Sequence, residues 1–239
     1  MEQVRNRLIV ALDVATMAEV RQLVENLGDA VSYYKVGMQL FYSVGMECLS
    51  YLREQGKDVF LDLKMHDIPN TVAQGAASLT RLGVAMINVQ ASGGMAMMQA
   101  AAEKVTETAN RLNIPRPKLI AVTVLTSMND AEWALLRNSA SIPDQVVHLA
   151  KMAKAAGLDG VVASPQEAEL IRAACGDDFA IVTPGVRPQG AALNDQSRVA
   201  TPADALKAGA HYLVVGRPIT AAQDPHVAAM AILEEMRKA

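Results

Sequence analysis

Two aspartates and a lysine stand close together between residues 60 and 71, where an apolar run ends in a polar turn. If the run is a strand, alternate side chains share a face, so Asp62 and Lys64 project to the same side. Asp67 follows at a point where Pro69 would stop regular strand pairing. A lysine between two carboxylates keeps its proton, because nearby negative charge favours the charged form. The spacing therefore predicts that Lys64 is a general acid whose ammonium group is held by Asp62 and Asp67.

The alternative interpretation of this cluster is an ion pair at the protein surface. Exposed pairs of this kind contribute only about 0–1 kcal/mol to the free energy of unfolding. Charged groups that enter an apolar run are costly to bury unless they are paired or used. The choice between the two interpretations depends on which other polar residues the fold brings beside the cluster.

The composition favours many packed helices and strands. Hydrophobic residues make up 51% of the 239, and a net charge of −3 argues against a broad basic surface for nucleic acid. Cys48 and Cys175 are far apart in sequence and are expected to be reduced thiols. The apolar run Leu8–Leu12 is too short for a signal peptide, and no run approaches the roughly 18 residues of a membrane span. We therefore expect a soluble, cytoplasmic protein with no membrane or nucleic acid partner.

Short aliphatic runs recur along the chain and alternate with alanine-rich amphipathic segments. Continuous runs of this length are typical of parallel strands that are covered on both faces. Their repetition without a long linker predicts a (β/α)8 TIM barrel, an α/β fold that occupies residues 1–239 as a single domain. The alternative, an open doubly wound sheet, normally carries a glycine-rich turn after its first strand, and Asp13–Thr16 is not one. The predicted strands are Leu8–Leu12, Tyr33–Val36, Val59–Leu63, Met86–Val89, Leu119–Leu125, Gly160–Ala163, Ala180–Thr183 and Tyr212–Val215.

Polar residues follow these predicted strands at their carboxyl ends, where barrel enzymes place their chemistry. Contact with water at a strand end accounts for hydroxyl and amide groups, but less well for charged residues that close an apolar run. Four charged residues do so: Asp13, Lys35, Asp62 and Lys64. Their positions favour a catalytic site at this rim over a surface ion pair.

The loops after the seventh and eighth predicted strands form a candidate phosphate site, as they commonly do in barrels. Gly216 allows close approach of the backbone, and Arg217 supplies a fork of donors suited to phosphate oxygens. Arg187 and Gln196 are further candidate ligands, in a loop after Pro184 that could close over a bound anion.

Taken together, these residues resemble the orotidine 5′-phosphate decarboxylases over essentially the whole chain. Sister families share the Asp-x-Lys-x-x-Asp element of residues 62–67, whereas the complete set of motifs is specific to this family. The motifs are Val10–Asp13, Tyr34–Gly37, Phe60–Lys64 with His66–Thr71, Val122–Ser127, Thr183–Pro188, Asp195–Gln196 with Arg198, and Val215–Pro218.

The resemblance implies a homodimer that removes the C6 carboxylate of orotidine 5′-monophosphate, the last step of de novo pyrimidine (UMP) synthesis, without metal or other cofactor. It implies that Lys64 protonates C6, that Asp62 lies beside the departing carboxylate, and that Asp67 is shared across the dimer interface. Lys35 completes the charge network. The residues implied to bind the substrate are Asp13, Lys35, Ile68, Thr71, Thr126, Pro184, Arg187, Gln196, Gly216 and Arg217.

Two other functions stay open at this stage. A magnesium-dependent sugar-phosphate decarboxylase or aldolase of a sister family would place a carboxylate where this chain has Lys35, whose charge repels a divalent cation. A catalytically silent nucleotide-binding barrel would be expected to lack a member of the charge network, and all members are present.

Overall fold

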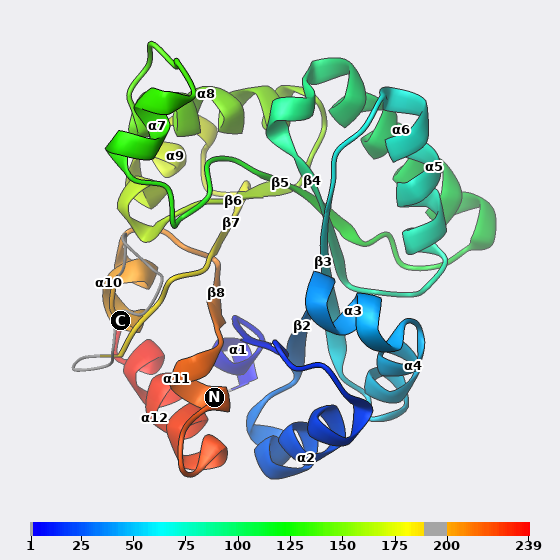
Figure 1. Cartoon of the computed structure of the whole chain (residues 1–239), viewed down its shortest axis with the longest axis vertical. Coiled ribbons are helices and arrows are strands. Elements are labelled where there is room, and N and C mark those ends of the chain that lie inside the picture. The colour runs from blue at the N-terminus through cyan, green and yellow to red at the C-terminus, as the bar shows by residue number, and fades with distance from the viewer. Residues whose placement is uncertain (1, 189–199) are drawn as a thin grey trace.

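The computed structural model describes residues 2–188 and 200–239. Eight parallel strands follow one another in chain order and close into a barrel, because β8 pairs with β1 (Figure 1). Closure confirms the predicted TIM barrel and excludes the open doubly wound sheet. The strands are β1 (Leu8–Ala11), β2 (Tyr33–Gly37), β3 (Asp58–Met65), β4 (Met86–Gln90), β5 (Lys118–Val122), β6 (Gly160–Val162), β7 (Ala180–Thr183) and β8 (Tyr212–Val215).

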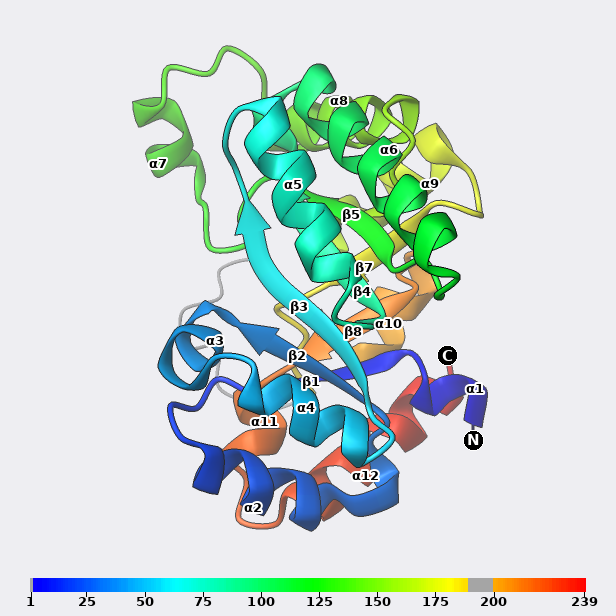
Figure 2. The ribbon, with the colours of Figure 1, turned by 90° about the vertical axis from the view of Figure 1, so that its right-hand side faces the viewer.

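Helices surround the strands and cover the outside of the barrel (Figures 1 and 2). The α-helices are α1 (Glu2–Arg5), α2 (Met17–Leu27), α3 (Met38–Val44), α4 (Glu47–Glu54), α5 (Pro69–Thr80), α6 (Met95–Leu112), α7 (Asp130–Leu135), α8 (Ile142–Ala155), α9 (Ala168–Cys175), α10 (Pro202–Lys207), α11 (Arg217–Thr220) and α12 (Pro225–Arg237). Three short 3₁₀ turns are η1 (Gly28–Ala30), η2 (Ala91–Gly93) and η3 (Pro165–Glu167).

The ends of these helices follow signals in the sequence. Ser164 and Thr201 act as N-caps, each accepting a hydrogen bond from a backbone N–H of the next turn, and each is followed by proline at the first position. After two other helices the backbone reverses at glycines with positive φ, Gly157 at 82° and Gly209 at 103°. Helix boundaries are therefore set locally.

The two largest differences from the predicted strand limits are in β5 and β3, whereas β1, β2, β4 and β6 differ by one residue at their carboxyl ends. Strand β5 ends at Val122 rather than Leu125, because its neighbour β6 offers no partner beyond Val162. Leu125 is 45% exposed, which is incompatible with a buried strand. Strand β3 continues past Leu63 to Met65, so Lys64 belongs to the strand and does not follow it.

On the inward face of several strands, apolar side chains in the barrel interior are followed by polar side chains at the rim. Phe60 and Met86 belong to a small apolar cluster that is separate from the larger one between strands and helices. Two residues further on, the same face of each strand carries Asp62 and Asn88, both buried. Strand β2 repeats this pattern with Lys35. The apolar interior therefore ends in a layer of charged and polar side chains.

Among the described residues, no helix combines the length and apolar character needed to span a bilayer. Cys48 and Cys175 are both buried and unpaired, as expected for reduced thiols.

At the opposite rim, His211 accepts hydrogen bonds at Nδ1 from the guanidinium of Arg172 at 2.8 Å and from the Ile181 N–H at 3.2 Å. Because both partners are donors, Nδ1 cannot carry a proton. Burial, followed by the positive charges of Arg172 and Arg7, lowers the pKa of His211 below its ordinary value of 6.5.

The unfolded chain therefore binds a proton at His211 at a higher pH than the folded protein does. We expect the free energy of unfolding to fall as the pH drops below about 6.5. This fall should be smaller in His211→Asn, because asparagine does not titrate. Urea unfolding of both proteins between pH 7.5 and 5 tests this. Parallel pH dependences in the two proteins would exclude His211 as the source.

Candidate active site

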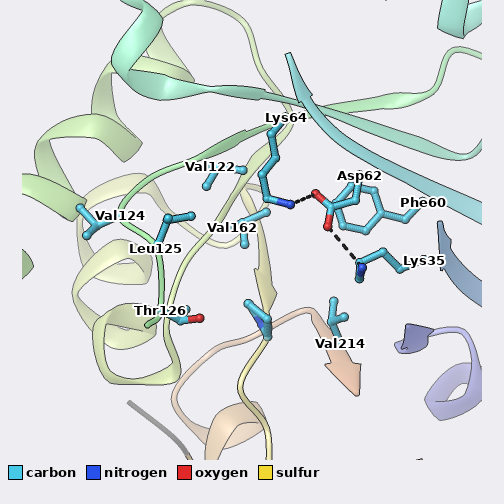
Figure 3. A pocket seen from close by; sticks show the side chains of 11 residues that line it. Lys35, Phe60, Asp62, Lys64, Val122, Val124, Leu125, Thr126, Val162 and Val214 are labelled. Carbon is cyan, nitrogen blue, oxygen red and sulfur yellow. Dashed lines mark hydrogen bonds and ion pairs between the residues drawn. The ribbon is translucent and has the colours of Figure 1, made fainter. Parts of the chain in front are cut away.

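Four charged side chains at the carboxyl ends of β1, β2 and β3 form a line of alternating sign. The Lys35 ammonium lies 3.1 Å from Asp13 Oδ1 and 3.5 Å from Asp62 Oδ2. The other oxygen of that carboxylate, Asp62 Oδ1, accepts from Lys64 Nζ at 2.6 Å. Figure 3 shows the two lysines reaching the Asp62 carboxylate from different strands. The structure thus brings together all four charged residues that close the predicted strands.

Asp62 is the most buried member of this line, with 8% of its surface exposed. Burial alone would raise the pKa of its carboxyl. The charges of Lys35 and Lys64, with hydrogen bonds from Lys64 and Asn88, outweigh that effect, and the pKa of Asp62 is lowered. The carboxylate therefore stays ionised at neutral pH, and it holds the Lys64 ammonium in a fixed direction.

Simple strand alternation does not explain the contact between Lys64 and Asp62. Lys64 has a φ of 51°, in the left-handed region that non-glycine residues rarely adopt, and the pairing of β3 with β4 shifts between Leu61 and Met65. The backbone N–H of Lys64 donates to Asn88 Oδ1 at 2.8 Å. A local irregularity of β3 therefore aims Lys64.

Asn88 also belongs to the site, although it was not among the predicted site residues. It is 1% exposed, and its Nδ2 donates to Asp62 Oδ1 at 2.6 Å. The only signal was a polar amide inside the apolar run from Met86 to Val89.

A cavity of about 140 Å³, here called the lysine cavity, opens beside Lys64 and Asp62. The wall around these charges is apolar, and Thr126 adds a hydroxyl across the space from Asp62 (Figure 3). The lining residues are Lys35, Phe60, Asp62, Lys64, Val122, Val124, Leu125, Thr126, Val162, Pro184 and Val214. Such a space suits a flat ring that lies against the apolar wall with one edge toward an ammonium group.

A second cavity of about 200 Å³, here called the arginine cavity, shares Lys35, Pro184 and Val214 with the first. Its lining comes from the ends of β1, β2, β7 and β8, and so includes residues after β7 and β8, where the sequence predicts a phosphate site. The lining residues are Ala11, Asp13, Lys35, Pro184, Gly185, Arg187, Val214, Gly216 and Arg217. Because the two cavities share residues, one elongated ligand can occupy both.

The two arginines give the second cavity its character. Arg187 is 8% exposed, and burial followed by the charge of Arg217 lowers the pKa of its guanidinium. Two guanidinium groups this close favour an anion with several oxygens, such as a phosphate.

Gly37 leaves the room that the Lys35 ammonium occupies. A Cβ at position 37 would stand 2.9 Å from Lys35 Nζ and 3.7 Å from Asp13 Oδ1. The backbone of Gly37 is extended, so the restriction comes from space rather than conformation. The absence of a side chain at the last residue of β2 therefore leaves Lys35 free to reach Asp62.

Three residues expected at the site line neither cavity. Asp67, Ile68 and Thr71 lie beyond β3 at the start of α5 and are exposed. Within the described ranges Asp67 has no ion pair, and its Oδ1 accepts from the N–H of Ile68. The prediction that Lys64 lies between Asp62 and Asp67 is therefore wrong within one chain, because the turn carries Asp67 away from the cavity. Gln196 lies outside the described residues.

The described part of the chain contains no group of three or more His, Cys, Asp or Glu side chains arranged to hold a metal ion. The anionic groups at the site are instead paired with lysines.

Comparison with known proteins agrees with this geometry. The sequence model of the orotidine 5′-phosphate decarboxylase / HUMPS family matches residues 6–232. The chain belongs to this family. It is 52% identical to an orotidine 5′-phosphate decarboxylase of Moorella thermoacetica over 97% of this chain and 92% of that protein. It is 51% identical to one of Syntrophotalea carbinolica, over 99% of this chain and 97% of that protein.

A crystal structure of orotidine 5′-phosphate decarboxylase from Lactobacillus acidophilus is similar to this structure throughout. The TM-score is 0.85 at 42% sequence identity, covering 96% of this chain and 98% of that one. Family membership and these relatives show that the chain is a decarboxylase. They do not favour the magnesium-dependent sister activity.

Proposed function

We propose that this chain removes the C6 carboxylate of orotidine 5′-monophosphate, giving UMP and carbon dioxide at the end of de novo pyrimidine synthesis. The observation that carries the proposal is the line of charges from Asp13 to Lys64 beside an apolar cavity. Decarboxylases of this name at about 50% identity over nearly the whole chain support it.

The chemistry demands a fixed cation. When the bond between C6 and the carboxylate breaks, the electron pair stays on an sp² carbon, outside the π system of the ring. The protein must stabilise that charge with a group positioned in advance, because no cofactor is proposed to accept the electrons. The Lys64 ammonium is that group: one of its protons passes to C6, and the neutral amine regains a proton from solvent.

Asp62 sets where this proton is held. Its carboxylate accepts from Lys64 Nζ at 2.6 Å, so the ammonium is shared between Asp62 and the substrate carboxylate until carbon dioxide leaves. Because the pKa of Asp62 is lowered, its charge persists at neutral pH. Lys35 contacts the second oxygen of Asp62 and prevents the carboxylate from turning toward another partner.

The shared lining of the two cavities gives the substrate its orientation. The pyrimidine occupies the lysine cavity and meets Thr126, while Asp13 and Lys35 contact the ribose hydroxyls between the cavities. The phosphate binds in the arginine cavity. The residues proposed to hold it are Pro184, Arg187, Gly216 and Arg217, with Gln196 from outside the described residues. Phosphate binding far from C6 then helps to orient the reacting carbon.

We also propose a homodimer in which Asp67, Ile68 and Thr71 complete the partner's site. These residues lie exposed at the carboxyl rim of the barrel, and Ile68 is 67% exposed. Helices α3 and α7 lie on the same side of the molecule (Figure 2), and α3 presents Tyr42 at 71% exposure. Large exposed apolar side chains at one rim support contact with a second copy.

Two broader features belong to the proposal. Pairing of β8 with β1 supports one barrel domain for residues 1–239. Two unpaired cysteines support a cytoplasmic location.

Conversion of orotidine 5′-monophosphate, followed by ultraviolet absorbance in excess chelator, tests the reaction directly. We expect rapid conversion by the natural sequence and nearly complete loss in Lys64→Ala, because this variant lacks the ammonium group that is proposed to protonate C6. Lys104→Ala, which removes a lysine paired with Glu107 on α6, is the matched control. No turnover by a protein that binds UMP would favour the silent barrel, and substantial turnover by Lys64→Ala would remove Lys64 from the acid role.

Arg217→Ala tests the phosphate site. Loss of a hydrogen bond to a charged group is worth about 1.5–3 kcal/mol, so kcat/KM should fall roughly 10- to 100-fold, with a raised KM. Arg237→Ala on α12, which loses only an exposed pair with Glu234, should behave like the natural sequence. Steady-state kinetics that are unchanged in Arg217→Ala would contradict the assignment.

Mixing of two inactive variants tests the shared site. Lys64→Ala and Asp67→Ala subunits, unfolded and refolded together, should regain about a quarter of full activity if each site needs one residue from each chain of a twofold dimer. Half of the dimers are then mixed, and one site in each is intact. Light scattering confirms the dimer, and no recovery in a proven mixture would place Asp67 outside the partner's site.

A further inference from the structure

We propose that Asn88 is a positioning residue for the decarboxylation, fixing the Lys64 backbone and the Asp62 carboxylate with the two ends of one amide. The inference rests on the proposed function, since it concerns the groups that carry out that reaction. Asn88 lies on β4, next to β3, and does not line the lysine cavity. It therefore acts through its neighbours rather than on the substrate.

The need for Asn88 begins in the irregular pairing of β3 with β4. Leu61 pairs with Ile87, and the next paired residue on β3 is Met65, opposite Val89. Four residue steps on β3 thus face two on β4, so β3 bulges where Lys64 lies. In a regular parallel ladder the Lys64 N–H would bond to a backbone carbonyl of the neighbouring strand. Here Asn88 Oδ1 takes that place at 2.8 Å.

This contact supports a conformation that costs free energy. A non-glycine residue with φ near 51° is disfavoured by about 1–2 kcal/mol and persists only where its surroundings hold it. Asn88 is 1% exposed, so its side-chain oxygen is shielded from water and remains available to the Lys64 N–H. The side-chain oxygen therefore stabilises the backbone turn from which the Lys64 side chain projects.

The other end of the amide holds the partner of Lys64. Asn88 Nδ2 donates at 2.6 Å to Asp62 Oδ1, the same oxygen that accepts from Lys64 Nζ. The amide orientation is fixed by its partners, because a backbone N–H requires an oxygen and a carboxylate requires an N–H donor. One side chain thus sets both the origin of the Lys64 side chain and the position of the carboxylate that its ammonium meets.

No other residue type supplies both contacts with the same reach. Alanine would remove both and leave a buried N–H and part of a buried carboxylate without their partner. Aspartate keeps the oxygen for the Lys64 N–H but places a second carboxylate against Asp62. Two carboxylates in contact raise the pKa of one of them, so the introduced carboxyl can donate to Asp62 only once it is protonated.

The experiment compares Asn88→Ala and Asn88→Asp with the natural sequence, with Thr108→Ala as a control at a buried threonine on α6, outside the site. The readouts are kcat and KM for orotidine 5′-monophosphate, the Kd of UMP, and exchange of the UMP C6 proton in deuterium oxide. Exchange reports the proton transfer by Lys64 without loss of carbon dioxide.

We expect Asn88→Ala to lower kcat and the exchange rate roughly 30-fold, as loss of a hydrogen bond to a charged group implies, with less than about threefold change in KM and Kd. For Asn88→Asp, activity relative to the natural sequence should rise as the pH falls and the introduced carboxyl gains its proton. A purely structural role would lower the folded fraction and leave kcat per folded site and its pH profile unchanged.

A kcat and exchange rate for Asn88→Ala within threefold of the natural sequence would overturn the inference, as would a pH-independent ratio for Asn88→Asp. Failure of the proposed function is distinguished from this result, because it would appear as no turnover by the natural sequence itself.

Discussion

Asp62 remains ionised although it is almost fully buried, because an ammonium group contacts each of its oxygens and an amide N–H supplies a further bond. Removing one member of a buried ion pair typically costs about 3–5 kcal/mol, since the remaining charge is left without compensation. The arrangement therefore constrains its neighbours. Gly37 must be small to leave room for Lys35, and Asn88 must present an amide to Asp62.

The barrel provides this arrangement through a small number of departures from regularity. Alternation along β2, β3 and β4 brings Lys35, Asp62 and Asn88 to one inward-facing layer above an apolar interior. Regular geometry is interrupted at Lys64, where β3 bulges against β4. A uniformly regular strand would satisfy its backbone through the ladder and leave the Asn88 oxygen without its N–H partner. The irregularity is thus a means of aiming the lysine, stabilised by a side chain from the next strand.

Local signals in the sequence were sufficient for most of the fold. Strand β7 and strand β8 have their predicted limits, and the caps at Ser164 and Thr201 lie where hydroxyl residues precede proline. The predicted end of β5 was wrong, because the end depends on where the neighbouring strand β6 stops. The aliphatic residues of the β5 segment itself do not reveal that position. The charged members of the site were also predicted, since a charge that closes an apolar run is visible in one sequence.

The features of the site that were not predicted depend on contacts between residues that are distant in sequence. The left-handed backbone of Lys64 is stabilised by Asn88, 24 positions away. Strand alternation alone predicts the contact between Lys64 and Asp62 but does not explain the irregular backbone that produces it. The interpretation of Asp67 as a second partner of Lys64 assumed that nearness in sequence is nearness in space. The turn before α5 breaks that assumption.

Lys35 lines both cavities, so it connects the arginine cavity to the line of charges that ends at Lys64. Its ammonium is shared between Asp13, which is largely exposed, and Asp62, which is buried. In the proposed substrate complex, a ribose hydroxyl bonded to Asp13 would compete for this carboxylate only at the exposed end of the line of charges. The buried contact between Lys35 and Asp62 would stay in place, and with it the carboxylate that holds Lys64. Under the proposed function, one lysine and two carboxylates thus connect the phosphate site to the reacting carbon.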